Sequence, residues 1–172
     1  EFITMNPYRL KLILQRAPRT VVMAEMADDG RLPSLILAQP PDDRLLSIYW
    51  VPPVRYPDGR LCLKIGGNRA SEPTVDTDAE LVDWFHTDGD PVEVEALTNS
   101  LRGLLPEADI ASITSAPCVT TNTPSGFPYI GWVSDGVAVA IGGNGSAAKS
   151  SDELGRLAAT LFTAEGWTDT LD

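Results

Sequence analysis

Short apolar runs separated by turn residues are the feature that most constrains the fold of this chain. The connections between the first four runs are too short to contain a helical crossover, so the strands they predict should pair antiparallel. Pro52-Pro53 is expected to end the third run, and Tyr56-Pro57-Asp58-Gly59 is typical of a turn. The predicted strands are Thr20–Met26, Leu35–Ala38, Leu46–Val51 and Leu61–Ile65.

A helix is predicted to follow Asp90-Pro91, because aspartate caps helix N-termini and proline fits the first helical position. Apolar residues then recur at spacings of three and four until Pro106, which gives one apolar stripe that should pack on the sheet. The stripe consists of Val94, Leu97, Leu101, Leu104 and Leu105.

The C-terminal third of the chain contains further strand and turn signals. Strands are predicted near Ile110–Ser115 and Tyr129–Val133, and Ser134-Asp135-Gly136 predicts a hairpin turn into the buried strand Val137–Ile141. The overall pattern therefore predicts an α+β fold, in which helices pack on a largely antiparallel sheet.

A strand, a glycine-rich loop at Gly142–Gly145 and a helix starting near Ser150 close the chain, with Ser150 and Glu153 at capping-box spacing. Amides at a helix N-terminus and glycines in the preceding loop suit a phosphate or an anionic ring. The segment is also a near miss to the phosphate-binding G-x-x-x-x-G-K-[ST] loop, with Ala148 where the second glycine belongs. A tight connection that binds nothing is the third interpretation.

Charge and composition argue against several classes of function. A net charge of −11 repels phosphate backbones, and the arginines and lysines form no basic cluster, so we expect no nucleic-acid partner. No apolar run reaches the roughly 18 residues of a membrane helix. Cys62 and Cys118 lack the spacing of a disulfide scaffold or a zinc site, which favours a reducing, cytoplasmic compartment and no metal.

Three side chains are candidates for chemistry, each with a plainer interpretation. The two-residue period of a strand puts Lys64 on the same face as Cys62. That face is either solvated, which is the plainer interpretation, or part of a covered pocket in which Lys64 has a function. Cys118 is either a small buried hydrophobe or a reactive thiol. His86 has no serine or cysteine partner in a recognisable motif and is expected to be structural or exposed.

Four segments, taken in order, resemble the C-terminal part of the family of FAD-dependent amine and amino-acid oxidases that includes monomeric sarcosine oxidase and D-amino-acid oxidase. The similarity runs from about Arg19 to Leu161, and it rests on the order and spacing of the segments together. These are Ile48–Pro53, Leu63–Gly66, Cys118–Pro124 and Ala140–Ser151.

The resemblance implies a fold and a division of the chain. In this family a largely antiparallel substrate domain covers the flavin ring, and the chain returns to the FAD-binding part through a strand, a glycine-rich loop and a helix. Residues 6–115 would then form the substrate-binding domain and residues 116–172 the return segment. Residues 1–5 precede or include Met5 and are expected to come from cloning.

The resemblance also implies roles for single residues. Lys64 resembles the lysine that promotes reaction of reduced flavin with oxygen, and Lys149 the lysine that helps to bind the substrate carboxylate. Tyr49 would stand in the substrate pocket, and Cys118 matches the position where some members tether flavin through a thioether. The residues that would line the pyrimidine edge of the ring are Gly143, Gly145, Ser146, Ala147 and Ala148.

The chain departs from the family at its start, where no G-x-G-x-x-G pattern for the ADP half of FAD occurs. We therefore expect a truncated part of an oxidoreductase that moves a hydride from a C–N bond to flavin and is inactive alone. Its partners would be a small amine or amino acid and the remaining FAD-binding domain or chain, with a homodimer as one way to cover exposed apolar surface. The alternative is a non-catalytic partner subunit or binding module with the same fold.

Overall fold

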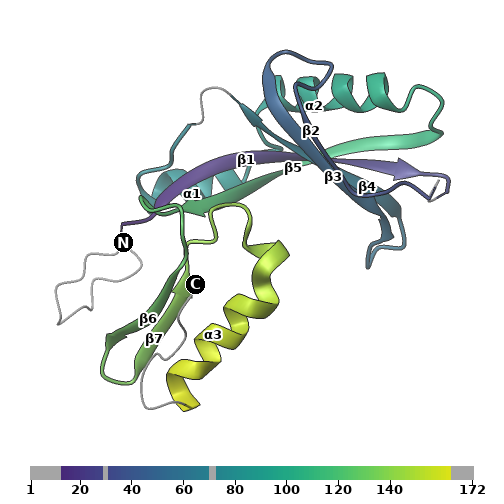
Figure 1. Ribbon diagram of the computed structural model, residues 1–172. Helices are drawn as coiled ribbons and strands as arrows, with labels where there is room; N and C mark the ends of the chain where they lie inside the picture. The colour runs from purple at the N-terminus through teal and green to yellow at the C-terminus, as the bar shows by residue number, and fades with distance from the viewer. Residues whose placement is uncertain (1–12, 29–30, 70–72, 164–172) are drawn as a thin grey trace. The chain divides into compact units, whose positions relative to one another are not determined.

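The computed structural model of the protein describes residues 13–28, 31–69 and 73–163 (Figure 1). The chain divides into two compact units. The first, which we call the sheet unit, is Pro18–Val119, and the second, the loop unit, combines Glu1–Ala17 with Thr120–Asp172. Residues 1–5, assigned above to cloning, lie outside the described residues.

A five-stranded antiparallel sheet dominates the sheet unit, with the strand order β2-β3-β4-β1-β5. Its strands are β1 (Gln15–Met26), β2 (Leu35–Ala38), β3 (Leu45–Arg55), β4 (Leu61–Arg69) and β5 (Ile110–Asn122). The pairs β1–β4, β2–β3 and β3–β4 are antiparallel. Ala27, just after β1, donates its amide to the carbonyl of Asp109, just before β5, so this pair is antiparallel too. The α+β class and the antiparallel sheet are confirmed.

One face of the sheet forms the core. Alternate residues of β1, such as Val22, are fully buried and their neighbours along the strand are not, and Leu63 and Ile65 of β4 are fully buried on the same face. The helix α2 (Pro91–Leu104) covers this face through Leu97 and Leu101, both with no exposed surface. The predicted apolar stripe and its packing on the sheet are therefore confirmed.

The start of α2 is fixed by charge and capping, as the sequence predicts. Asp90 is the N-cap and accepts hydrogen bonds from the amides of Val92 and Glu93 at 2.8 and 3.2 Å. Arg69 at the end of β4 donates to the same carboxylate at 2.6 Å. Desolvation opposes ionisation, but these hydrogen bonds prevail and hold the pKa of Asp90 below its usual value.

In the described residues, the loop unit contains a β-hairpin and an α-helix. Strands β6 (Tyr129–Ser134) and β7 (Val137–Ile141) pair antiparallel across the predicted turn, and the 3-10 turn η1 (Ala147–Ser150) leads into α3 (Ser151–Thr163). Helix α3 packs against the hairpin, where Trp132 and Phe162 meet edge to face with centroids 4.9 Å apart (Figure 1). No helix among the described residues is both long and apolar enough to cross a bilayer.

Several predicted bounds are wrong. Pro52-Pro53 does not end β3, because a bulge between Val51 and Val54 lets the strand resume and pair as far as Arg55. The strand predicted for Ile110–Ser115 continues to Asn122. Ser150 is not the cap of the last helix, since it ends η1, and both oxygens of Glu153 accept hydrogen bonds from Arg156.

The helix α1 (Asp78–Phe85) was not predicted from the sequence. Thr77 caps it, and Thr77 and Glu80 form a full capping box in which each side chain accepts a hydrogen bond from the backbone of the other residue. None of its residues is fully buried. The capping-box spacing of Thr77 and Glu80 was the sequence signal that indicated this helix. The helix was missed because its apolar stripe is weak.

Candidate functional site

The sheet face opposite α2 carries two of the predicted catalytic residues, Tyr49 on β3 and Lys64 on β4. Val51 pairs with Lys64 and Tyr49 with Gly66, so the alternation of the strands puts these side chains on one face. Met23 of β1 pairs with Lys64 from the other side. Lys64 is half-buried rather than fully solvated, and Tyr49 is 37% exposed.

Tyr49 lies across β4 because Gly66 leaves room for it. A Cβ atom at Gly66 would fall 2.7 Å from the phenol oxygen of Tyr49 and 2.9 Å from its ring. The tyrosine therefore occupies the space that a side chain at position 66 would fill, and its hydroxyl points along the sheet towards β1, whose Val21 pairs with Gly66. This packing fixes the position of the hydroxyl on the candidate face.

The surroundings of Tyr49 change its acidity. Desolvation raises the pKa of its phenol, the nearby Cys118 acts in the same direction, and the positive charge of Arg19 acts against both. The phenol thus stays protonated at neutral pH and can donate a hydrogen bond. Arg19 was missed by the sequence reasoning, although it stands on β1 in alternation with the half-buried Val21 and Met23.

Cys118 is half-buried in β5, and its backbone is held by α1. The indole nitrogen of Trp84 donates a hydrogen bond to the carbonyl oxygen of Cys118 at 2.9 Å. This bond attaches α1, none of whose residues is fully buried, to β5. The other thiol, Cys62, is 1% exposed, and burial raises its pKa. Both cysteines are free, and Cys118 is the more accessible of the two.

The glycine-rich loop of the loop unit takes a left-handed course after β7. Gly142, Asn144 and Gly145 all have positive φ, at 79°, 51° and 69°. The amide of Asn144 donates to the carbonyl of Thr121 at 2.9 Å, and the Asn144 Oδ1 accepts from the amide of Thr123 at 2.8 Å. These bonds fasten the loop to the end of β5.

Two of the glycines are required by close packing inside the loop. A Cβ atom at Gly142 would overlap the methyl group of Thr123, and one at Gly143 would lie 2.8 Å from the Cβ of Ala147. Gly145, by contrast, is exposed and has only the Thr120 methyl group near it, at 3.4 Å. The loop therefore turns a bare stretch of backbone outward.

The residues that follow the loop are small and mostly exposed. Ser146 leads into η1, where its carbonyl accepts from the amide of Lys149 at 3.2 Å. Ser146, Ala148 and Lys149 are exposed, and Ala147 is half-buried against Gly143. A flat ligand can approach this segment closely, and Lys149 supplies a positive charge beside it.

The predicted residues thus fall into two sets. Tyr49, Lys64 and Cys118 belong to the sheet unit, where the structure places the first two on one face and the third within electrostatic reach of Tyr49. The cofactor-binding set from Gly143 to Lys149 belongs to the loop unit. His86, at the end of α1, is exposed and belongs to neither set, as predicted.

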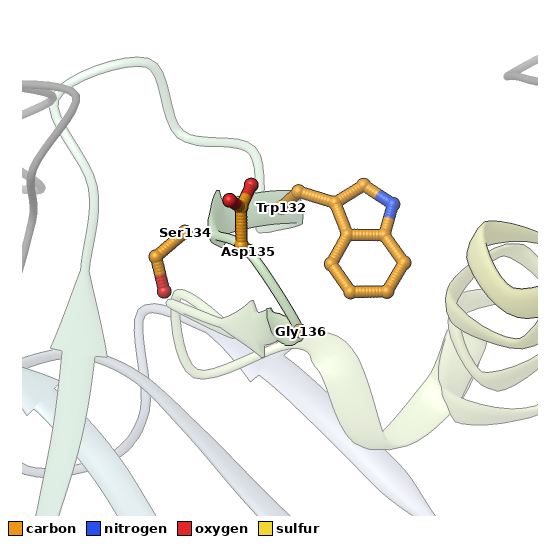
Figure 2. A pocket seen from close by; sticks show the side chains of 4 residues that line it. All are labelled: Trp132, Ser134, Asp135 and Gly136. Carbon is orange, nitrogen blue, oxygen red and sulfur yellow. The ribbon is translucent and has the colours of Figure 1, made fainter.

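A shallow hollow in the loop unit lies apart from the predicted residues. It measures about 500 Å³ and surrounds the turn between β6 and β7, with Trp132, Ser134, Asp135 and Gly136 on its walls (Figure 2). The indole of Trp132 also contacts Phe162 of α3. None of the predicted site residues lines this hollow.

Comparison with known families decides the identity of the chain. The profile of the family "FAD dependent oxidoreductase" matches residues 4–161, which is nearly the whole chain. The chain belongs to this family. No curated protein matches it.

Solved structures of family members share its fold. NikD, described as an unusual amino acid oxidase essential for nikkomycin biosynthesis, is similar over 93% of the chain, with 17% identity and a TM-score of 0.63. Glycine oxidase from Geobacillus kaustophilus is similar over 92%, with 19% identity and a TM-score of 0.58. Amadoriase I from Aspergillus fumigatus is similar over 89%, with 18% identity and a TM-score of 0.54.

The similarity covers only part of each of these proteins. The chain spans 41% of NikD, 38% of the glycine oxidase and 36% of the amadoriase. For this chain the comparisons show membership of the family "FAD dependent oxidoreductase" and a mixed, mostly antiparallel fold.

The residues present suit the ring of the cofactor that the family uses. Exposed, small residues at Gly145, Ser146 and Ala148 leave the backbone open to a flat ring, and the loop precedes a helix of 13 residues whose N-terminal end favours negative charge. At the adjoining end of β5, the buried hydroxyl of Thr120 has no hydrogen-bond partner among the described residues. The loop therefore gives such a ligand access to exposed backbone beside a helix N-terminus.

Proposed function

We propose that this chain is the substrate-domain and C-terminal portion of an FAD-dependent oxidoreductase that oxidises the C–N bond of an amine or amino acid. The observation that supports this most strongly is that Tyr49 and Lys64 lie on the same sheet face, opposite α2, in a chain of this family. NikD and glycine oxidase are amino acid oxidases by name, which is consistent with such a substrate.

The open face provides a lining for a small organic substrate. Ile36 pairs with Tyr49, so an aliphatic side chain, the phenol and Val51 lie together and are 71%, 37% and 37% exposed. Apolar walls with one hydroxyl and one ammonium group suit a molecule with a hydrocarbon part and a polar end. Tyr49 would orient the substrate by donating a hydrogen bond from its protonated phenol.

The loop unit would hold the flavin ring. Gly143, Gly145, Ser146, Ala147 and Ala148 would line its polar edge, and Lys149 would contribute positive charge to that edge and to a substrate carboxylate. Bound flavin supplies the hydride acceptor that no amino-acid side chain can replace. An imine is the expected product, with hydrogen peroxide as second product where oxygen is the final acceptor.

Lys64 and Cys118 would act on the flavin side of the reaction. A half-buried ammonium group stabilises negative charge that develops nearby, because there is little water around it to do so. We assign this role to Lys64. Cys118 would tether the ring through a thioether, and the bond from Trp84 to its carbonyl would hold it in place.

The wider setting is part of the same proposal. The dinucleotide-binding portion would come from the rest of a longer polypeptide or from a partner chain, and the open sheet face would be covered by it or, in its absence, by a second copy of the chain. Two free thiols favour a reducing, cytoplasmic location.

Flavin uptake is the experiment that tests this function. The chain, supplied with the dinucleotide-binding portion that the proposal requires, is titrated with FAD, its visible absorption is followed, and a panel of amines and amino acids is then added without oxygen. We expect bound flavin to lose its colour with at least one substrate, and Lys64→Met to slow reoxidation by oxygen about 100-fold, which is the scale for removing one group that stabilises developing charge. Arg60→Met is the matched control, because Arg60 is an exposed cation paired with Asp58 at a turn.

The same samples separate the alternatives. Colour that stays with acid-precipitated protein, and is lost in Cys118→Ala but kept in Cys62→Ala, would support the tether. A chain that folds without taking up flavin, and in which Lys64→Met and Lys149→Met change nothing, would instead be the non-catalytic module.

A further inference from the structure

Glu25 is an acidic residue on the candidate face, near the end of β1. The strand alternates, so Glu25 is half-buried on the same side as Val21 and Met23, whereas Ala24 is buried in the core. Lys64 of β4 pairs with Met23 and lies on this side too. The face that carries the predicted catalytic residues therefore also carries a carboxylate.

Among the residues that the structure describes, the carboxylate of Glu25 has a single hydrogen-bond donor. The hydroxyl of Ser112 on β5 donates to its Oε2 at 2.7 Å. Lys64 is a diagonal neighbour of Glu25, at a typical separation of about 7 to 8 Å, and no ion pair joins the two described residues. Cys62 pairs with Glu25 and stays neutral, because burial raises the pKa of its thiol. The carboxylate can therefore accept a further hydrogen bond from a cation.

An apolar strip separates this carboxylate from the phenol of Tyr49. The phenol lies over Gly66, which pairs with Val21, and Glu25 follows Val21 by four residues, or about 13 Å along the strand. Val21 and Met23 provide the side chains between the two ends on β1. Hydrogen bonds take up about 3 Å at each end, so about 7 Å remains for a ligand. An extended chain of about six bonds has this length, since each bond of about 1.5 Å advances the chain by about 1.25 Å.

The charges on the face set the direction in which such a ligand lies. Arg19 is half-buried on the same side of β1, and its positive charge acts on the phenol of Tyr49. This end therefore favours the carboxylate of an amino acid, and Glu25 favours an ammonium group at the other end. Lys64 lies beside the middle of the strip, where an uncharged stem would pass it.

We propose that Glu25 determines substrate specificity by binding a second, non-reacting ammonium group of a basic amino acid or a diamine. Lysine and 1,5-diaminopentane have the required spacing of about six bonds between their two nitrogen atoms. A substrate without the second ammonium group leaves the carboxylate partly desolvated and without its cation, which weakens binding. This inference rests on the proposed function and deepens it, because it selects one class among the amines and amino acids.

Substrate pairs that differ by one ammonium group test this assignment. Lysine is compared with norleucine, as both enantiomers, and 1,5-diaminopentane with pentylamine. The protein is the chain supplied with its dinucleotide-binding portion and loaded with FAD, and flavin reduction without oxygen is followed against substrate concentration. Glu25→Gln removes the charge at nearly constant size. Glu95→Gln is the matched control, because it removes the same charge from an exposed position on α2, on the other side of the sheet.

We expect the second-order rate constant of reduction to favour the member with the extra ammonium group about 10- to 100-fold in at least one pair, which is the scale of a hydrogen bond between charged groups. Glu25→Gln should lower this ratio below about threefold, and Glu95→Gln should keep it. Ser112→Ala should lower it about two- to fivefold, because Ser112 is a positioning residue that holds the carboxylate without touching the substrate.

A second variant keeps the charge and changes its reach. Glu25→Asp shortens the side chain by one methylene group, so the preference should move from 1,5-diaminopentane to 1,6-diaminohexane. A merely structural role for Glu25 would not produce this change in preferred length, and the melting temperature of each variant shows whether it is folded at the assay temperature.

Other results would overturn the assignment. Similar rates for both members of each pair in the wild type would show that the face does not select a second cation, and the proposed function would stand. If Glu25→Gln slowed both members equally and kept the ratio, Glu25 would act on Lys64 or on folding and not on the substrate. A complex whose flavin no amine reduces would remove the proposed function itself, and this inference with it.

Discussion

The two units of this chain differ in how many of their apolar side chains are buried. In the sheet unit, α2 and alternate residues of three strands enclose a continuous core that includes Leu63, Ile65 and Leu97, none of which has exposed surface. In the loop unit, the buried apolar side chains of the hairpin and α3 are Val133 and Leu157, while Phe127 and Phe162 are 74% and 68% exposed.

The difference indicates where each unit obtains its stability. A two-stranded hairpin with one helix is marginal in water, whereas a five-stranded sheet with a packed helix has enough interior to fold independently. In the described residues, the local hydrogen bonds around Asn144 therefore carry a larger share of the stability in the loop unit than such bonds do in the sheet unit.

The largest expected effect comes from emptying the core of the sheet unit. Leu97→Ala should lower the free energy of unfolding by about 3 kcal/mol, because it removes a fully buried side chain between α2 and the sheet. Urea denaturation measures the free energy of unfolding, and hydrogen exchange at β4 measures the effect within the sheet. The control is Leu46→Ala, at a leucine that is 57% exposed, for which we expect less than about 1 kcal/mol. Equal losses in the two variants would mean that α2 is not what stabilises the sheet.

A smaller effect is expected from strain in the loop unit. Gly142→Ala places a methyl group against Thr123 and forces alanine into a positive φ, which should cost about 2 kcal/mol. Gly155→Ala is the matched control, because Gly155 is an exposed helical glycine with open space around it, and alanine there should add about 0.5 to 1 kcal/mol.

Hydrogen exchange shows where these two changes act. Gly142→Ala should speed exchange in β6 and β7 and leave β4 unchanged, because Gly142 belongs to the loop unit and β4 to the core of the sheet unit. If Gly142→Ala loosened β4 by the same amount, the comparison between an independent unit and a dependent one would be wrong.

The contrast between the units also explains what the sequence could predict. The strands β2 and β7 were predicted to the residue, because turn residues flank each run, and the stripe of α2 was predicted because it serves one large core. In the loop unit the start of α3 was predicted to within one residue, but η1 was not predicted, and Ser150 ends η1 instead of capping the helix. Local propensity cannot anticipate a turn that depends on the packing of Ala147 against Gly143.

The candidate site was predictable only where a family motif marks it. Tyr49 and Lys64 could be assigned, and alternation could place Lys64 on a face, but the tyrosine's position across Gly66 depends on strand pairing. Trp84 has no such motif. It becomes a candidate through a single tertiary fact, the hydrogen bond that its indole donates to the Cys118 carbonyl.

The smallest expected effect concerns Glu93, the one acidic side chain that is buried among the described residues of the sheet unit. Glu93 is 4% exposed, and desolvation raises its pKa above the ordinary 4.5, although a hydrogen bond with Thr20 and the charges of Arg69 and Arg19 act in the opposite direction. Between the unfolded and folded pKa values the folded chain holds more protons than the unfolded chain. The contribution of Glu93 to stability is therefore complete below pH 4.5 and is lost as the pH rises through its folded pKa.

Glu93→Gln removes this titration and should flatten the fall in stability between acidic and neutral pH, by about 1 kcal/mol at most. Urea denaturation at several pH values measures it, with Glu95→Gln as the control, because Glu95 lies on the same helix with 65% of its side chain exposed and pairs with Arg44. If Glu93→Gln instead steepened the dependence on pH, Glu93 would be ionised in the folded chain. The core of the sheet unit would then contain a compensated charge, and the contrast with the loop unit would rest on apolar burial alone.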